Sequence, residues 1–316
     1  MRIAFVDSVH PVLAERLTMA GHGTIALQNS SDESLRNELN DVEGIVVRSR
    51  MLPAELLRHA PSLRFVARVG AGLENIDRSY CSAHGITVLN SPEGNRDGVG
   101  ELCVAQTLAL LKHLHRADQQ VHHGLWLREE NRGTDLFGKT VGIIGFGNMG
   151  SAFAKKLGGF GVRVLAHDKY RQDLGDPTVH DCSLDTLLKE CDVISLHLPL
   201  NEETRHFADA TFFSRLGRPV WFLNTARGGL VHTAALLDAL DKGQVISAAL
   251  DVLEFERPDL SGLDPMNEPA TQRRLLDHPN VILTPHIAGV THEGKLKMAT
   301  ILADKILEAF PNDLHP

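Results

Sequence analysis

The chain has 316 residues, a formal net charge of −8 and 43% hydrophobic residues, as expected of a globular protein with two cores. The acidic balance argues against a nucleic-acid partner, and no apolar run reaches membrane-spanning length. The N-terminal segment lacks the long apolar core of a signal peptide, so we expect a cytoplasmic protein. The four cysteines show no C-x-x-C spacing, so we expect reduced core thiols and no metal site.

Short apolar strands and short helices alternate in the N-terminal third, which predicts a parallel α/β unit. Strands are expected at 3–6, 45–47, 65–69 and 86–89, and helices at 11–20 and 53–60. A long apolar helix is then expected from residue 99 to about 123. Such a helix is buried on several sides, so it would link two lobes and be available to a partner subunit. Segment 126–138 is polar and irregular, as in an arm or an ordinary surface loop.

A second lobe begins with the most informative stretch of the chain. It contains a strand at 140–144, the motif G-x-G-x-x-G, a helix at 151–157, a strand at 162–166 and then Asp168. In that motif Gly145 allows a tight turn, Gly147 lets a pyrophosphate approach the backbone, and Gly150 lets the helix pack closely on its strand. The helix N-terminus suits an anion, and Asp168 stands where a carboxylate can hold the adenosine ribose. The order of these parts predicts dinucleotide binding.

The choice between NAD and NADP depends on the residues around Asp168. Its carboxylate repels a 2′-phosphate, and no arginine follows it directly, which favours NAD. Lys169 and Arg171 leave NADP open.

Three ionisable residues follow strands in the second lobe. Further strands are expected at 193–198, 220–223, 248–252 and 281–283, and helices at 184–190, 233–242 and 292–309. Arg227, Glu256 and His286 come after the last three strands, one βα unit apart. Because ligands bind at the carboxyl ends of parallel strands, we expect the three to face one crevice.

These three residue types suit the oxidation of a 2-hydroxy acid. Histidine can take the hydroxyl proton, a carboxylate stabilises the imidazolium, and a guanidinium grips a substrate carboxylate through two hydrogen bonds. A lone arginine, glutamate or histidine in a loop is more often structural, so the argument depends on the combination.

The blocks GIIGFGNMG, NTARGGLV, LDVLEFERP and LTPHIAG resemble the signature blocks of the D-isomer-specific 2-hydroxyacid dehydrogenases. The resemblance covers essentially the whole chain. It implies an α/β fold of two Rossmann-like parallel-sheet domains, with an NAD-binding Rossmann domain at 98–287 inserted into a flavodoxin-like substrate domain at 1–97 and 288–316. It implies that Arg227, Glu256 and His286 are catalytic, with Glu254 as the near rival for the carboxylate.

The same resemblance implies further contacts. Arg227 and His286 would also bind the substrate, together with Ala71, Gly72 and Arg48. The cofactor-binding residues would be Gly145, Gly147, Asn148, Met149, Gly150, Asp168, His197, Leu198, Pro199, Thr225, Ala226 and Asp251.

Within the family, VVRSR, GAGLENID and NSPEGN resemble the phosphoglycerate dehydrogenase branch, here without a regulatory domain. D-3-phosphoglycerate and phosphohydroxypyruvate are therefore the expected substrates, and a homodimer is the expected assembly. Arg48 or Arg50 would reach the phosphate, and Arg48 matches the family position better. Two alternatives remain: a glyoxylate/hydroxypyruvate reductase, which shares every catalytic block, and an NADH-sensing corepressor-like protein.

Overall fold

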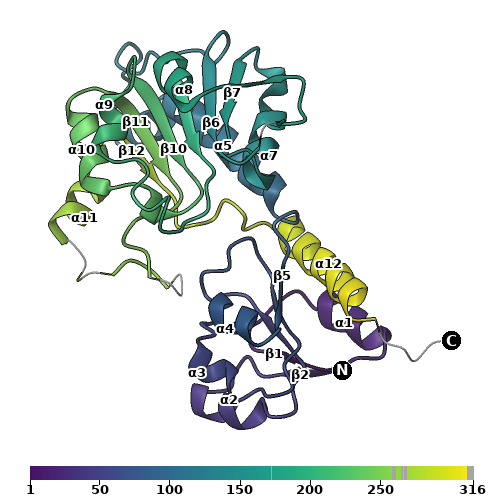
Figure 1. Cartoon of the computed structure of the whole chain (residues 1–316). Coiled ribbons are helices and arrows are strands. Elements are labelled where there is room, and N and C mark those ends of the chain that lie inside the picture. Colours follow the sequence, from purple (N-terminus) through teal and green to yellow (C-terminus); the bar gives the residue numbers. More distant parts are fainter. Residues whose placement is uncertain (172, 258–260, 265, 267–268, 312–316) are drawn as a thin grey trace. The chain divides into compact units, whose positions relative to one another are not determined.

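The computed structural model describes residues 1–171, 173–257, 261–264, 266 and 269–311. Within these ranges the chain forms two compact units (Figure 1). The first unit contains residues 1–96 and the C-terminal segment from 290, and the second contains residues 97–257 and 261–289. The N- and C-terminal segments thus share one unit, and the middle of the chain forms the other.

The first unit is a five-stranded parallel sheet in the order β2-β1-β3-β4-β5, covered by helices on both faces. One face packs under the short helices α2–α4 and the other under α1 and α12. Arg16 of α1 donates to Asp304 of α12 at 2.6 Å, so the last helix of the chain packs beside the first (Figure 1). The strands are β1 (Arg2–Phe5), β2 (Gly23–Ala26), β3 (Gly44–Val47), β4 (Phe65–Arg68) and β5 (Thr87–Asn90), and the helices are α1 (Val12–Met19), α2 (Asp32–Glu38), α3 (Ala54–Leu57), α4 (Arg78–Ala83) and α12 (His292–Ala309).

The second unit is a seven-stranded parallel sheet in the order β12-β11-β10-β9-β6-β7-β8. The chain starts in the middle at β6, runs outward to β8 and then returns to β9 on the other side, so the order reverses between β6 and β9. The strands are β6 (Thr140–Ile144), β7 (Arg163–His167), β8 (Val179–Asp181), β9 (Val193–Leu196), β10 (Val220–Asn224), β11 (Val245–Leu250) and β12 (Val281–Leu283).

Helices cover both faces of this larger sheet. One core lies under α8, α9 and α10 and the other under α5 and α7. The helices are α5 (Arg96–Leu111), α6 (Leu114–His122), α7 (Asn148–Lys156), α8 (Leu184–Glu190), α9 (Ala210–Ser214), α10 (Thr233–Asp241) and α11 (Pro269–Leu276), with single 3₁₀ turns at Leu157–Gly159 and Gly228–Leu230.

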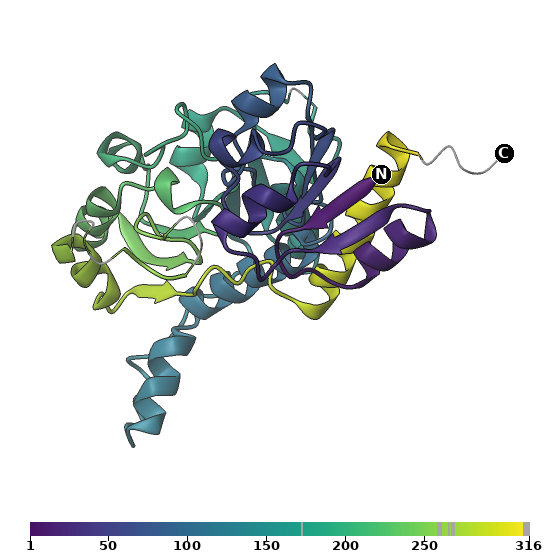
Figure 2. The ribbon, with the colours of Figure 1, turned by 90° about the horizontal axis from the view of Figure 1, so that it is seen from below.

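The expectation of one continuous helix from residue 99 to about 123 is wrong. It is broken at His113, whose φ of 53° lies in the left-handed region, so α5 ends at Leu111 and α6 begins at Leu114. The second piece has no buried residue, because the sequence after Leu114 is polar. Figure 2 shows α6 as a blue helix extending away from the rest of its unit.

Smaller differences affect strands. The edge strand β2 was not expected, because three of its four residues are exposed and give no apolar pattern. Strand β11 begins three residues before the expected 248. The four cysteines are free, and three of them are buried. Among the described residues, no helix has the length and apolar character needed to cross a membrane.

Candidate active site

Arg227, Glu256 and His286 follow three adjacent strands of the larger sheet. They come after β10, β11 and β12, which pair in parallel, so their loops leave the same carboxyl edge. The Nδ1 of His286 lies 3.0 Å from Oε2 of Glu256, and both side chains are largely buried. The other oxygen, Oε1, accepts a hydrogen bond from the N–H of Leu253 at 2.6 Å. The carboxylate is therefore fixed at both ends and orients the imidazole.

The loop that carries Glu256 is closed on itself. Glu256 forms an antiparallel bridge with Leu263, and the N–H of Asp264 donates to the carbonyl of Phe255 at 2.8 Å. Phe255 is buried. The sequence predicted a loop here, and its hydrogen bonds give the carboxylate a defined position.

The loop that carries His286 is held by Asp251, which is completely buried at the end of β11. Its Oδ1 accepts hydrogen bonds from the Thr284 hydroxyl at 2.5 Å and the Ile287 N–H at 2.9 Å, and its Oδ2 accepts one from the Ala288 N–H at 2.8 Å. The His286 N–H also donates to the Asp251 carbonyl at 2.7 Å. Burial raises the pKa of Asp251, although these donors act in the opposite direction.

This support explains the backbone of His286. Its φ of 55° is in the left-handed region, which few residues other than glycine adopt without strain. The bonds from Asp251 to residues on both sides hold that conformation. Asp251 is thus a structural anchor of this loop, and its expected contact with the cofactor is a proposal.

The turn that carries Arg227 is held by Asn224, which is fully buried. Its amide Nδ2 donates to the Arg227 carbonyl at 2.9 Å, and its Oδ1 accepts from the Ala226 N–H at 3.0 Å. The Arg227 guanidinium donates to the Ala226 carbonyl at 2.6 Å. Asn224 gave no signal of its own in the sequence, where it is one polar residue at a strand end.

Glu254, the near rival of Glu256, has different partners. Its Oε1 lies 2.5 Å from Nε2 of His206, and its Oε2 accepts from the N–H of Thr233 at 2.8 Å. Both oxygens therefore face α10 and the loop that carries His206. Only Glu256 of the two contacts His286 among the described residues.

The glycine motif has the geometry of a phosphate cradle. Gly145 has φ of 91°, and a Cβ there would lie 2.6 Å from the His197 carbonyl oxygen. A Cβ at Gly150 would collide with the carbonyl of Gly145, so α7 packs directly on the turn. A Cβ at Gly147 would meet nothing within 4 Å, so this position faces open space. In the described part of the chain, the N–H groups of Asn148 and Met149 have no acceptor, as is usual at a helix N-terminus, and such groups suit an anion.

Asp168 follows β7 and turns back to the glycine motif. Its Oδ2 accepts from the Phe146 N–H at 2.8 Å, and its Oδ1 accepts from the N–H groups of Tyr170 and Arg171 at 3.0 and 3.2 Å. Burial acts to raise the pKa of Asp168, but these three donors and the Arg171 charge hold it below its usual value. The Arg171 guanidinium donates to the Phe146 carbonyl at 2.5 Å. The residues around Asp168 thus fit a dinucleotide whose adenosine ribose has free hydroxyl groups.

The remaining expected cofactor residues lie after β9, beside the glycine turn, and after β10. The N–H of His197 donates to the Ile144 carbonyl at 2.7 Å, and burial lowers the pKa of its ring to about 4. Leu198 lies against Gly145, and Pro199 accepts a hydrogen bond from Thr204 at its carbonyl. The Thr225 hydroxyl lies 3.3 Å from Sγ of Cys103 on α5, and Ala226 belongs to the Asn224 turn.

Arg48, Ala71 and Gly72 belong to the first unit, at the carboxyl ends of β3 and β4. The Arg48 residue is exposed, whereas the Arg50 guanidinium donates to the Ser30 carbonyl at 2.6 Å. Among the described residues, the N–H groups of Ala71 and Gly72 have no acceptor, which suits an anion.

Two residues that sequence reasoning missed organise these segments. Asp7 accepts hydrogen bonds from the N–H groups of Arg48, Ser49 and Arg50 at 2.7 to 2.9 Å. Arg68 donates to the carbonyls of both Arg48 and Gly72, so it joins the two segments. A single acid after β1 and a single arginine ending β4 form no sequence pattern that would have identified them.

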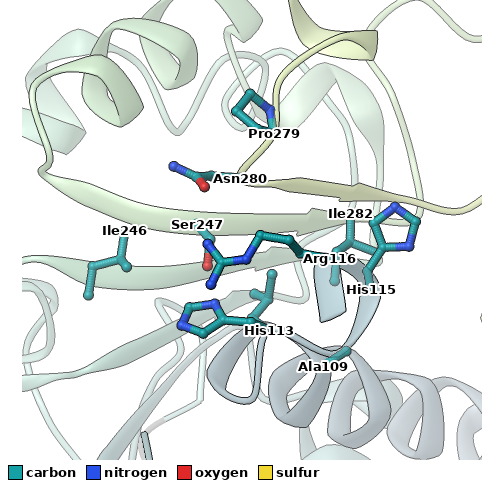
Figure 3. A pocket seen from close by; sticks show the side chains of 10 residues that line it. Ala109, His113, His115, Arg116, Ile246, Ser247, Pro279, Asn280 and Ile282 are labelled. Carbon is teal, nitrogen blue, oxygen red and sulfur yellow. The ribbon is translucent and has the colours of Figure 1, made fainter. Parts of the chain in front are cut away.

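A cavity of about 150 Å³ lies elsewhere in the second unit (Figure 3). It is lined by the amino-terminal half of β11, by Asn280 just before β12, and by His113 and Arg116 at the break between α5 and α6. It therefore lies toward the amino ends of the strands, and none of Arg227, Glu256 and His286 lines it.

Residues 104–288 match the family model described as the NAD-binding domain of D-isomer specific 2-hydroxyacid dehydrogenases. The chain belongs to this family. As a D-2-hydroxyacid dehydrogenase it is an oxidoreductase that uses NAD and acts on a CH–OH group.

Relatives of this dehydrogenase carry two different names. A hydroxypyruvate reductase of Thermotoga maritima is 35% identical over 90% of each chain. A D-3-phosphoglycerate dehydrogenase of Bacillus subtilis is 34% identical over 86% of this chain and 50% of its own. The dehydrogenase thus spans about half the length of that second relative.

Solved structures of dehydrogenases and reductases are also similar to this chain. A D-lactate dehydrogenase from Aquifex aeolicus, complexed with NAD and lactic acid, has a TM-score of 0.82 at 30% identity and covers 98% of this chain and 95% of its own. An NADPH-dependent glyoxylate/hydroxypyruvate reductase from Sinorhizobium meliloti, in complex with NADP and malonate, has a TM-score of 0.80 at 30% identity and covers 100% and 96%. The dehydrogenase fold of two parallel-sheet units is therefore confirmed.

Proposed function

We propose that the protein transfers a hydride between NAD and a D-2-hydroxy acid, with D-3-phosphoglycerate and phosphohydroxypyruvate as the substrate pair. The observation that carries this proposal is the 3.0 Å contact between His286 and Glu256 at the strand edge that also bears Arg227. In this assignment residues 98–287 form the nucleotide-binding domain, and 1–97 with 288–316 form the substrate domain.

Each residue has a role in this reaction. NAD, when bound, accepts or supplies the hydride. The N–H groups at the start of α7 hold its pyrophosphate, and Asp168 accepts hydrogen bonds from the ribose hydroxyls. Arg227 binds the substrate carboxylate as a two-pronged donor, with the Ala71 and Gly72 N–H groups. His286 exchanges the hydroxyl proton, and the Glu256 carboxylate stabilises its imidazolium form.

Arg48 is the residue that supports a phosphorylated substrate. It is exposed, and its backbone is fixed by Asp7, so its guanidinium is available to a phosphate. The 35% identity to a hydroxypyruvate reductase over 90% of both chains favours a second candidate, a reductase of unphosphorylated 2-oxo acids.

The test is NADH oxidation at neutral pH with phosphohydroxypyruvate, hydroxypyruvate and glyoxylate side by side. A large kcat/KM advantage for the phosphorylated acid that is lost in Arg48→Ala supports the phosphoglycerate assignment. Equal or better use of the other two acids assigns the protein to the reductases. No turnover with any of the three contradicts both and favours an NADH-sensing, corepressor-like binding protein.

We further propose a homodimer that forms through α6 and the segment after it. Four large apolar side chains are exposed there, Leu114, Val121, Leu125 and Trp126, with exposed fractions of 48–76%. Light scattering after size exclusion measures the mass, and Trp126→Ser with Val121→Ser should shift it toward one chain. An unchanged mass would rule out this surface as the interface.

We infer a cytoplasmic location from the free thiols, because four unpaired cysteines suit a reducing compartment. Cell fractionation followed by immunoblotting tests this location.

A further inference from the structure

Glu254 and His206 form a contact that the proposed chemistry does not use. Their side chains meet at 2.5 Å, and Glu254 is only 18% exposed. Glu254 stands two residues before Glu256, and His206 lies in the loop between β9 and α9. The pair thus joins the Glu256 loop to a distant part of the same unit.

The loop that His206 occupies is paired with the segment that follows Arg227. The His206 N–H donates to the Gly229 carbonyl at 2.8 Å, and the Ala208 N–H donates to the Leu230 carbonyl at 2.9 Å. The second oxygen of Glu254 accepts from the Thr233 N–H at the start of α10. Glu254 is therefore bonded to the loop that pairs with segment 227–232 and to Thr233, the residue directly after that segment.

The two catalytic loops also touch directly. A Cβ at Gly228 would collide with the backbone of Leu253, so the residue after Arg227 packs on the residue before Glu254. Leu253 in turn donates its N–H to Glu256. A shift of segment 227–232 would therefore change the position of Arg227 relative to Glu256 and His286.

The backbone of His206 is itself specialised. Its φ of 53° lies in the left-handed region, and its ring meets the edge of His232, which caps α10, with centroids 4.9 Å apart. A residue in this backbone region persists only where its surroundings hold it, and Glu254, Gly229 and His232 provide that support here.

We propose that His206 and Glu254 are positioning residues, a brace that sets the distance between Arg227 and the His286–Glu256 pair. This inference rests on the proposed function, because the brace acts through the group that holds the substrate carboxylate. The proposal assigns Glu254 no role in proton transfer. The brace fixes the position of Arg227 relative to the His286–Glu256 pair. Its loss should therefore weaken substrate binding more than cofactor binding.

The test compares Glu254→Ala, Glu254→Gln and the surface control Arg215→Ala, which removes an exposed ion pair to Asp185 in the same unit. Glu254→Ala should lower kcat/KM for the 2-oxo acid by about 10- to 100-fold, mainly through a higher KM, and leave the NADH dissociation constant within about twofold. Glu254→Gln keeps an acceptor for Thr233 and should recover part of the loss. Arg215→Ala should match the parent.

A double-mutant cycle separates positioning from general destabilisation. Because the brace acts through Arg227, adding Glu254→Ala to Arg227→Ala should cost much less than it costs in the parent. Equal losses in both backgrounds, or a parent-like KM in Glu254→Ala, would overturn the proposal.

Crystal structures distinguish this failure from failure of the proposed function. If the parent shows no turnover, the function is wrong, but the brace still predicts that segment 227–232 moves away from Leu253 in Glu254→Ala. An unmoved segment would overturn the brace whatever reaction the protein catalyses.

Discussion

The Nδ1 of His286 lies 3.0 Å from Oε2 of Glu256, while Oε1 of the same carboxylate is bound by the Leu253 N–H. The pair is thus built from a loop after β11 and a loop after β12, two strands that are neighbours in the sheet. This arrangement leaves the Nε2 of His286 as the atom that would meet the substrate hydroxyl.

Glu256→Gln should lower kcat by about 100-fold or more, because a neutral amide neither stabilises the imidazolium nor fixes the ring as well. Stopped-flow NADH oxidation measures this loss in kcat. Asp185→Asn removes a surface carboxylate and should retain parent rates; a Glu256→Gln enzyme as active as this control would contradict the role.

Arg227→Ala should lower kcat/KM for the 2-oxo acid by about 3 kcal/mol, or roughly 150-fold, and leave NAD affinity intact. Arg227→Lys keeps the charge without the two-pronged geometry and should recover only part of this. Steady-state kinetics and calorimetric titration with NADH give the two quantities. A collapse of NADH affinity with normal turnover at saturating cofactor would assign Arg227 to the cofactor instead.

Gly147→Ala and Gly150→Ala should separate cofactor binding from folding. A methyl group at Gly147 faces open space, so the free energy of unfolding should change by less than about 1 kcal/mol while NAD affinity falls. A methyl at Gly150 meets the Gly145 carbonyl and should destabilise the protein by about 1–3 kcal/mol or more. Urea unfolding and NADH titration report both, and equal effects of the two variants would refute this division.

Asp168→Ser should reduce the preference for NADH over NADPH by about tenfold or more. The parent carboxylate is ionised at neutral pH, since its pKa is held below the usual value, and it repels a 2′-phosphate. The ratio of kcat/KM for the two cofactors is the readout. A parent enzyme that already prefers NADPH would show that Lys169 and Arg171 outweigh Asp168.

His197 should make the protein less stable as the pH falls. Burial lowers its pKa from 6.5 to about 4, so the unfolded chain binds a proton that the folded chain rejects between these values. The contribution of the neutral His197 ring to the free energy of unfolding is therefore fully present above pH 6.5. It is lost as the pH falls toward 4, by up to about 3 kcal/mol. Urea unfolding of the parent and His197→Gln at pH 7 and 4.5 should show the smaller loss in the variant. Equal losses would mean that other groups cause the acid sensitivity.

The sequence predicted those parts of the site that follow from periodic strands. Each βα unit delivers its loop to the same edge, so Arg227, Glu256 and His286 were expected together from their spacing alone. The glycine motif was predictable because each glycine has its own steric reason, and the structure shows a collision at Gly150 and open space at Gly147.

Other features depend on contacts that leave no local pattern. The separate partners of Glu254 and Glu256 follow from how one short loop folds, and the sequence ranked the two carboxylates without revealing what either one contacts. The break at His113 interrupts a segment of good helix formers, and only the left-handed backbone of that residue marks it. Asp7 accepts from the N–H groups of three consecutive residues, 48–50, and the pairing of β1 with β3 brings it to them.

The anchor provided by Asp251 has a practical consequence for redesign. It binds the loop around His286 through two main-chain N–H groups and the Thr284 hydroxyl, so the side chain of Ile287, which is 41% exposed, contributes nothing to that anchorage. Position 287 can therefore accept any residue except proline, which lacks the N–H that Asp251 binds, while the imidazole one residue away keeps its place. A library at this position would change the side chain next to His286 in the chain without altering the acid and base.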